Sequence, residues 1–309
     1  MDSILKQQFR RIDRDKHSGA NELALKGVHA LGEWARRNPR ANERDLLSVV
    51  QGLLKTQPDM APFLRLANEV ALAIDADRPC KEILKSCASI EFVLKHGARR
   101  IAQMLWRELG SGRRKTILTY SYSSTVLRAL IHSKSRIRRI YCSEASPEME
   151  GRALARKLAK AGLHVTLTTD LSLPSFIHGI DESHPRPDAI VVGADQVRPQ
   201  QFVNRYGTEI LVEQAQEARV PFWVLTDTSK FVPEIGSRRN KSRTEASARL
   251  WRGAAKGVEP WLRLLGEAPL AAHVRVLSER GWMTPEQVRR AIRQIRISTR
   301  LKAVLETLD

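Results

Sequence analysis

The stretch from Asp188 to Val232 reads DAIVVGADQVRPQQFVNRYGTEILVEQAQEARVPFWVLTDTSKFV, and it decides the fold. A short apolar run at residues 189–192 is bounded by a polar residue and a glycine, which is typical of a strand buried on both faces of a parallel sheet. After a polar loop, an amphipathic helix begins at Gly207 and Thr208, and residues 221–225 form a second buried strand. This order predicts one right-handed β-α-β crossover unit.

Polar residues gather where such a unit binds its ligands. Open α/β sheets bind ligands outside the carboxyl ends of their strands, and the free N–H groups at a helix start favour anions. The polar residues that follow the strands or open the helix are Asp195, Asn204, Arg205, Gly207, Thr208 and Lys230. They predict one anion-binding pocket, although the residues alone leave open a purely structural unit in which Asp195 caps a turn.

Residues 1–112 predict an N-terminal helical domain. Apolar residues recur there at helical spacing, with no strand signal between them. The clearest helical segments are 21–37, 46–54, 60–74 and 80–109. Gly110, Gly112 and the basic triplet that follows interrupt the pattern and mark the predicted boundary.

Residues 113–309 predict a second domain built on a parallel sheet. Further strands at 116–119, 137–142 and 164–168 alternate with helices ahead of the opening stretch. The predicted fold class is therefore α/β, with an N-terminal helical domain followed by a doubly wound, Rossmann-like parallel sheet. Residues 284–308 are expected to form one basic C-terminal helix.

Composition limits the class of protein. The chain has 309 residues, and no apolar run approaches the roughly 18 residues of a membrane span, so we expect a soluble, cytoplasmic protein without membrane contact. Three cysteines form no CxxC pair and eight histidines form no HExxH motif, so we expect neither a metal nor a cofactor.

The formal net charge of +18 favours phosphate-bearing partners. Residues 237–309 hold sixteen Lys or Arg against seven Asp or Glu, which is half of the excess. No basic groove with interleaved aromatic residues is evident, so a solvated basic face is preferred over a dedicated nucleic-acid surface. We expect at most weak, non-specific binding of nucleic acid.

Several motifs in a fixed order resemble a known family. They are DRDKHSGANELALKGVHAL (13–31), ILTYSYSSTVLRAL (117–130), YCSEASPEMEGRALARKL (141–158), GADQV (193–197), FVNRYGT (202–208), PFWVLTDTSKF (221–231) and APLAAHVRVLSERGWMTPEQV (268–288). In these motifs the chain is similar to the family that joins the alpha, beta and delta subunits of eukaryotic translation initiation factor 2B with ribose-1,5-bisphosphate isomerase and methylthioribose-1-phosphate isomerase. The likeness spans nearly the whole chain.

The resemblance implies a catalytic pair and a phosphate cradle. In the isomerases a cysteine follows the first strand of the sheet and pairs with the Asp of the GAD motif; here those positions are Ser121 and Asp195. A hydroxyl is a far weaker acid than a thiol, so the pair is only half retained. The resemblance also assigns phosphate binding to Ser18, Gly19, Ala20, Ser123 and Ser124, beside Asn204, Arg205, Gly207, Thr208 and Lys230. Taken alone, Ser18 or Asn21 more often serves only as a helix N-cap.

Two functions follow from the resemblance. The first is a sugar-phosphate aldose–ketose isomerase related to ribose-1,5-bisphosphate isomerase. The alternative is a non-catalytic, initiation factor 2B-like regulatory or assembly subunit that senses a phosphorylated metabolite. Under either function we expect a phosphorylated small molecule as ligand and a homodimer or higher homo-oligomer.

Overall fold

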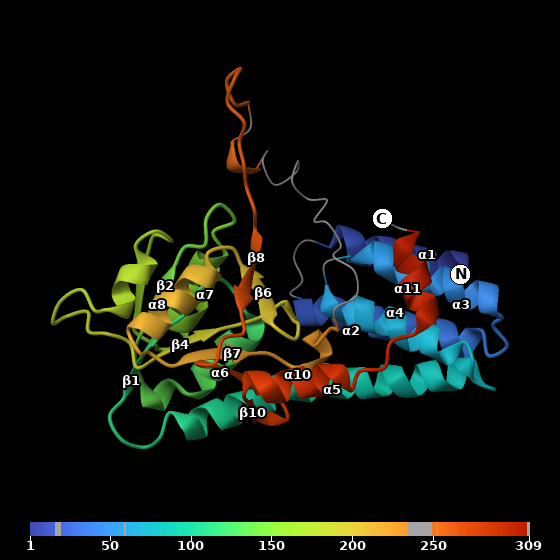
Figure 1. Ribbon diagram of the computed structural model, residues 1–309, viewed down its shortest axis with the longest axis horizontal. Helices are drawn as coiled ribbons and strands as arrows, with labels where there is room; N and C mark the ends of the chain where they lie inside the picture. Colours follow the sequence, from blue (N-terminus) through green and yellow to red (C-terminus); the bar gives the residue numbers. More distant parts are fainter. Residues whose placement is uncertain (16–19, 59, 234–248, 252, 308–309) are drawn as a thin grey trace. The chain divides into compact units, whose positions relative to one another are not determined.

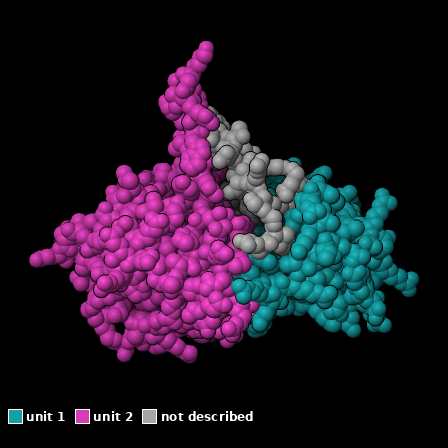
Figure 2. Space-filling view, viewed as in Figure 1, with its two compact units in different colours: residues 1–97, 227–238, 291–309 teal, residues 98–226, 239–290 magenta. Residues whose placement is uncertain are grey.

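The computed structural model describes residues 1–15, 20–58, 60–233, 249–251 and 253–307. The chain divides into two compact units, coloured teal and magenta in Figure 2. Unit 1 comprises residues 1–97, 227–238 and 291–309, and unit 2 comprises residues 98–226 and 239–290.

Unit 1 is a helical unit. Its N-terminal helices are α1 (Ser3–Arg14), α2 (Ala20–Arg37), α3 (Glu43–Thr56), α4 (Ala61–Ala73) and the first part of α5 (Pro79–Glu108). Side chains such as Trp34, Leu53 and Phe63 fall on inward faces and are fully buried, which contributes about 1.5 to 3 kcal/mol for each aliphatic or phenyl side chain. Asn42 begins α3, because its side chain accepts a hydrogen bond from Asp45 N at 3.0 Å. The four helical segments predicted from the sequence correspond to helices α2, α3, α4 and α5, and their bounds differ only at the ends.

The prediction of one helix over residues 284–308 was wrong. Two helices form instead, α10 (Pro285–Arg293) and α11 (Thr299–Glu306). The buried side chain of Asn68 occupies the break between them: its Nδ2 donates to Arg296 O at 2.9 Å, and its Oδ1 accepts from Ser298 N at 3.1 Å. Helix α11 then packs on α3 and α4, with Leu301 in the core of unit 1.

Unit 2 carries the predicted sheet. Within the described residues it has seven strands, in the order β10-β9-β7-β4-β1-β2-β3 (Figure 1). The strands are β1 (Lys115–Leu118), β2 (Ile137–Ser143), β3 (Val165–Thr168), β4 (Ala189–Val192), β7 (Phe222–Leu225), β9 (Val274–Ser278) and β10 (Gly281–Met283). Neighbouring strands are parallel except β9 and β10. The six parallel strands have the order of a doubly wound sheet, so the predicted fold class is confirmed.

The order of the strands reverses between β1 and β4. Strand β1 pairs with β2 on one side and with β4 on the other. The chain moves outward from β1 to β3, returns to β4 and continues on the opposite side. The loops that follow β1 and β4 therefore flank the switch point, where sheets of this kind bind their ligands.

Helices and short turns connect the strands of the sheet. They are α6 (Ser124–His132), α7 (Glu150–Lys160), α8 (Thr208–Glu217) and the short 3-10 turns η1 (Lys134–Arg136) and η2 (Leu173–Ile177). Ile117 and Val191 of the sheet share one buried cluster with Val126 of α6, Leu154 of α7 and Ile101 of α5. This packing fixes the starts of α6 and α7 beside the carboxyl ends of the strands.

The polar loop predicted between residues 195 and 207 is a β-hairpin. Its strands are β5 (Gln196–Val197) and β6 (Gln201–Arg205), and β8 (Leu265–Pro269) extends them into a three-stranded antiparallel sheet within the described residues. Phe202 of β6 is buried with its ring centroid 6.3 Å from that of Phe222. Strands of two and five residues hold too few alternating positions to be recognised in the sequence.

The two units differ from the predicted division at residue 112. The end of α5, from residue 98, and the loop up to residue 112 belong to unit 2, because Ile101 and Leu105 pack in its core. Residues 227–238 and 291–309 belong to unit 1. Across the described ranges, no helix has both the length and the apolar character needed to cross a bilayer.

Candidate functional site

Ser121 and Asp195 follow the two strands that flank the switch point. Asp195 comes three residues after β4, and its backbone N–H donates to Val203 O at 2.8 Å. The two loops meet closely, because a Cβ atom on Gly193 would lie 2.6 Å from Ser123 Oγ. Only glycine permits this approach, and it brings the GAD segment against the start of α6.

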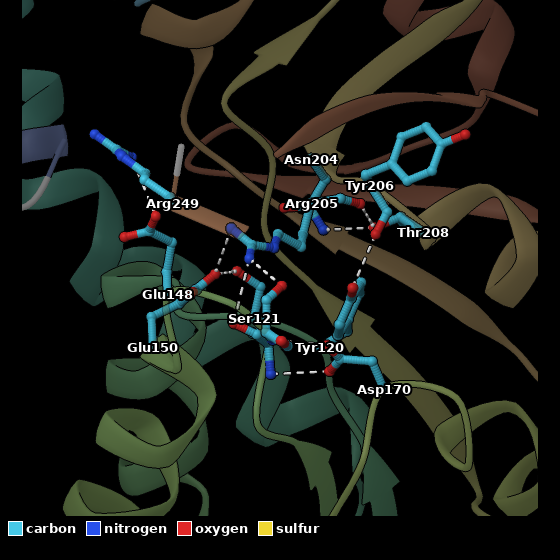
Figure 3. A network of polar contacts seen from close by, with 12 residues as sticks. Tyr120, Ser121, Glu148, Glu150, Asp170, Asn204, Arg205, Tyr206, Thr208 and Arg249 are labelled. Carbon is cyan, nitrogen blue, oxygen red and sulfur yellow. Dashed lines mark hydrogen bonds and ion pairs between the residues drawn. The ribbon is translucent and has the colours of Figure 1, made fainter. Parts of the chain in front are cut away.

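Ser121 lies in an unusual backbone conformation and contacts an acid that the sequence did not single out. Its φ of 64° is in the left-handed region, which a non-glycine residue adopts only where the surrounding structure holds it. Its hydroxyl donates a hydrogen bond of 3.0 Å to Oε1 of Glu150, the first residue of α7 (Figure 3). The serine at the family's cysteine position therefore has a carboxyl partner.

Glu150 is also paired with Arg205. Arg205 Nη1 lies 3.3 Å from Glu150 Oε1, and the arginine side chain is buried on strand β6. Its second terminal nitrogen donates to Ala145 O at 3.2 Å and to Ser146 O at 2.5 Å. Arg205, which we predicted to bind phosphate, thus directs both terminal nitrogens at groups of the protein (Figure 3).

The electrostatic state of Glu150 reflects its burial. Loss of solvent raises the pKa of this carboxyl above its ordinary value, although Arg205 and the hydrogen bond from Ser121 both favour the carboxylate. The second carboxyl oxygen, Oε2, is buried and accepts no hydrogen bond within the described part of the chain. Glu150 therefore keeps its proton to a higher pH than an ordinary glutamate does.

The loop between β2 and α7 is shaped to hold Glu150 in place. Ala145 and Met149 have left-handed φ values of 57° and 58°. Asp170 accepts hydrogen bonds from Ala145 N at 2.9 Å and from Ser146 N at 2.6 Å. Gly151 packs so closely on the end of β2 that an added Cβ would lie 1.9 Å from a carbonyl oxygen, that of Ser143.

The polar groups at the start of α8 form hydrogen bonds with residues close to them in the sequence. Thr208 Oγ1 donates to Arg205 O at 2.6 Å and accepts from Asn204 Nδ2 at 3.0 Å. Gly207 has a φ of 96° and its N–H donates to the side chain of Glu209. Asn204, Arg205, Gly207 and Thr208 therefore lie together in one turn, in which the side chains of Asn204, Arg205 and Thr208 are buried.

Tyr120 joins this turn to the loop after β1. Its hydroxyl donates to Tyr206 O at 2.8 Å (Figure 3). Burial raises the pKa of the Tyr120 phenol, so it stays protonated and acts as a hydrogen-bond donor. The two loops that carry Ser121 and Arg205 are thereby tied together.

The other predicted binding residues are spread over both units. Ser123 is the N-cap of α6, where its Oγ accepts from Val126 N at 3.4 Å, and Ser124 is the first residue of that helix. Ala20 begins α2 in unit 1. Lys230 is buried at the end of the turn η3 (Thr228–Lys230), also in unit 1. Ser18 and Gly19 lie outside the described residues.

Three residues of the network were missed in the sequence, namely Tyr120, Glu150 and Asp170. Glu150 was hard to recognise because an acid in the first turn of a helix usually serves the helix dipole. Asp170 follows β3, so the rule that polar residues after strands line the ligand crevice would have found it. No cluster of His, Cys, Asp or Glu suited to hold a metal ion occurs in the described ranges.

The fold and this network define an α/β protein that gathers polar groups at the switch point of a doubly wound sheet. Residues 16–259 match the initiation factor 2 subunit family. The match covers well over half of the chain, so this protein belongs to the initiation factor 2 subunit family, and the resemblance seen in the sequence is confirmed.

Two relatives represent the two branches of the family. The chain is 30% identical over 235 residues to a translation initiation factor eIF-2B "subunit 2-like" protein of Pyrococcus horikoshii, which covers 74% of this chain and 80% of that relative. It is 32% identical over 222 residues to ribose 1,5-bisphosphate isomerase of Archaeoglobus fulgidus, with 70% and 68% covered.

Solved structures share the fold. The translation initiation factor eIF-2B of Pyrococcus horikoshii superposes with a TM-score of 0.71 at 24% identity, over 92% of this chain and 98% of that one. A chain of the tetrameric eIF2B-β2-δ2 complex from C. thermophilum superposes with a TM-score of 0.67 at 18% identity, over 94% and 93%.

Proposed function

We propose that this protein binds a sugar phosphate and catalyses an aldose–ketose isomerisation like that of ribose 1,5-bisphosphate isomerase. The observation that carries the proposal is the arrangement at the switch point: Ser121 follows β1, Asp195 follows β4, and the two strands are neighbours. Relatives named as ribose 1,5-bisphosphate isomerase support the same reaction class.

In this proposal the two residues have different tasks. Asp195 moves a proton while the sugar ring opens and the carbonyl forms, and Ser121 hydrogen-bonds the reacting oxygen. The helix starts bind the phosphate through their N–H groups and hydroxyls. The proposed phosphate ligands are Ser18, Gly19, Ala20, Ser123, Ser124, Asn204, Arg205, Gly207, Thr208 and Lys230.

The hydrogen bonds around Glu150 define the role of Arg205 more closely. Because Arg205 is engaged with Glu150 and two backbone carbonyls, its part in binding is to order the loop that precedes α7. The N-terminus of α6, with Ser123 and Ser124, is then the main phosphate site in unit 2.

The test is a thermal-shift screen of sugar phosphates, ribose 1,5-bisphosphate first, followed by turnover of each compound that stabilises the protein. Asp195→Asn should lower kcat by about 10²-fold or more while binding persists. Asp181→Asn is the matched control, because Asp181 pairs with His184 on an exposed loop. If no sugar phosphate stabilises the protein, the proposal is wrong; binding without turnover would identify a metabolite-sensing subunit instead.

We also propose that the protein is a homodimer or a higher homo-oligomer. The tetrameric relative supports this state. Sedimentation equilibrium should give a mass at least twice the 34.9 kDa of one chain. A monomer at micromolar concentration would contradict it.

A further inference from the structure

The hydrogen bond between Ser121 and Glu150 has no part in the roles proposed above. The 3.0 Å contact joins the end of β1 to the start of α7, and the left-handed backbone at Ser121 aims the hydroxyl at the carboxyl group. The other oxygen of Glu150 is buried and accepts no hydrogen bond from the described residues. A half-buried carboxyl hydrogen-bonded to a hydroxyl resembles a proton-exchanging pair more than a salt bridge with a purely structural task.

We propose that Glu150 holds the proton that the Ser121 hydroxyl exchanges with the substrate, so that the two residues together replace a single thiol. This inference rests on the proposed isomerase function. Glu150 acts through Ser121 and is a positioning residue, whereas Ser121 touches the reacting oxygen.

With these roles, every proton and electron pair is accounted for when a cyclic aldose phosphate reacts. Asp195 takes the hydrogen of C2 as a proton, the C2–H electron pair forms a C1=C2 double bond, and the bond from C1 to the ring oxygen breaks. The ring oxygen keeps that electron pair and takes the proton of Ser121, which is replaced at once from Glu150.

The second half returns both protons. The enol O–H at C2 gives its proton through Ser121 to Glu150, and its electron pair forms the carbonyl. The electrons of the double bond take the proton held by Asp195 and form a C–H bond at C1. Each residue ends as it began, so no co-reactant is needed.

The surroundings of Glu150 decide whether it begins with a proton. Arg205 on β6 favours the carboxylate, while Glu148 on the same loop opposes it. Tyr120 after β1 is buried and neutral, and Asp170 after β3 adds negative charge near the phenol. Burial outweighs the arginine and raises the pKa of Glu150, which suits a group that donates first.

The rival explanation is that Glu150 only neutralises Arg205 and thereby orders the loop. The two explanations differ in their pH dependence. If Glu150 supplies a proton, kcat/KM must fall as pH rises through its pKa, and this alkaline limb must vanish when the group cannot titrate. A structural carboxylate gives no such limb.

The experiment measures kcat and kcat/KM against pH for the full-length protein with ribose 1,5-bisphosphate. The variants are Glu150→Gln, Ser121→Ala and, as matched control, Glu148→Gln, whose exposed carboxylate pairs with Arg249 at 3.1 Å. We expect Glu150→Gln and Ser121→Ala each to lower kcat by about 10²- to 10⁴-fold, with KM little changed and the alkaline limb lost. Glu148→Gln should keep kcat and retain the alkaline limb, moved slightly to lower pH because the charge of Glu148 helps to raise the pKa of Glu150.

Every outcome decides the matter. Full kcat in folded Glu150→Gln overturns the inference and leaves the isomerase proposal standing. If Glu150→Gln does not fold, the pH profiles of the unchanged protein and of Ser121→Ala decide: the inference requires an alkaline limb in the unchanged protein that Ser121→Ala removes, and a profile without that limb overturns it. If the unchanged protein turns over no sugar phosphate, the isomerase proposal and this inference fall together.

Discussion

Arg205 on β6 and Glu150 on α7 form an ion pair of 3.3 Å in which the arginine side chain is only 7% exposed. Removing one partner of such a pair leaves an uncompensated charge in a poorly solvated place. Arg205→Met should therefore lower the free energy of unfolding by about 3 kcal/mol, the lower end for a buried pair, because Glu150 is partly exposed.

Urea denaturation provides the measurement, and the double variant provides the control. Arg205→Met combined with Glu150→Gln should be more stable than Arg205→Met alone, because no buried charge is left without a partner. Equal stability of the single and double variants would mean that the pair does not interact across the loop.

The stability of the protein should depend on pH through Glu150. Because its pKa is higher in the folded chain than the ordinary value of 4.5, the folded state holds more protons than the unfolded state above that pH. The contribution of Glu150 to the free energy of unfolding therefore falls as the pH rises from 4.5 through the raised pKa of the folded state. The free energy of unfolding of Glu150→Gln, relative to the unchanged protein, should rise as the pH increases above 4.5, whatever the offset at lower pH. A constant difference would show that the pKa is not raised.

Gly151 should tolerate no side chain. An added Cβ would lie 1.9 Å from Ser143 O, so Gly151→Ala must displace backbone and should cost at least about 1 to 3 kcal/mol of unfolding free energy. Gly112→Ala is the matched control, since no heavy atom lies within 4 Å of its added Cβ. A thermal midpoint for Gly151→Ala equal to that of Gly112→Ala would contradict the close packing at the end of β2.

Asn68 should matter for unit 1 out of proportion to its size. Asn68→Ala leaves Arg296 O and Ser298 N without their partner, and each unsatisfied buried group costs about 1 to 3 kcal/mol. Ser86→Ala removes one hydrogen bond, to Glu69 on the same unit, and should cost less. Hydrogen exchange of the amides in α11 should speed up in Asn68→Ala and stay slow in Ser86→Ala.

Nucleic-acid binding should be weak, independent of sequence and steeply salt-dependent. Arg290, Arg293 and Lys302 are exposed on α10 and α11, and release of counterions should remove most binding between 50 and about 200 mM salt. Reversing these three charges should weaken binding of a short RNA without changing the thermal midpoint. Removing the basic residues by truncation after Ile292 is not a suitable test, because it would also remove Leu301 from the core of unit 1. Tight binding of the RNA at high salt would contradict this prediction and would make the basic helices α10 and α11 part of the main function.

The sequence predicted those parts of the fold that repeat a pattern over many residues. Strand β4 was predicted with its observed bounds, and α2 to α5 with errors only at their ends, because long amphipathic segments carry many concordant positions. Strands β5 and β6 were missed because they are short. The break between α10 and α11 was missed because Asn68, which binds the backbone there, is far away in the sequence. No local pattern records such a contact.

The candidate site shows the same division. Asp195 and the turn from Asn204 to Thr208 were singled out because strand ends and helix starts are visible in the sequence, and Ser121 because of the family resemblance; their part in a site stays a prediction. The pairing of Glu150 with Ser121 and Arg205 could not, because three separate loops must fold before these side chains meet.

The placement of α11 in the core of unit 1 has a consequence for how the chain is made. A ribosome makes residues 1–97 well before Leu301, yet both belong to one packed unit. The whole sheet of unit 2 is synthesised in between, and domains generally fold as units once their residues have emerged. The apolar face of the amino-terminal helices that α11 covers therefore stays without this partner until α11 itself has been made.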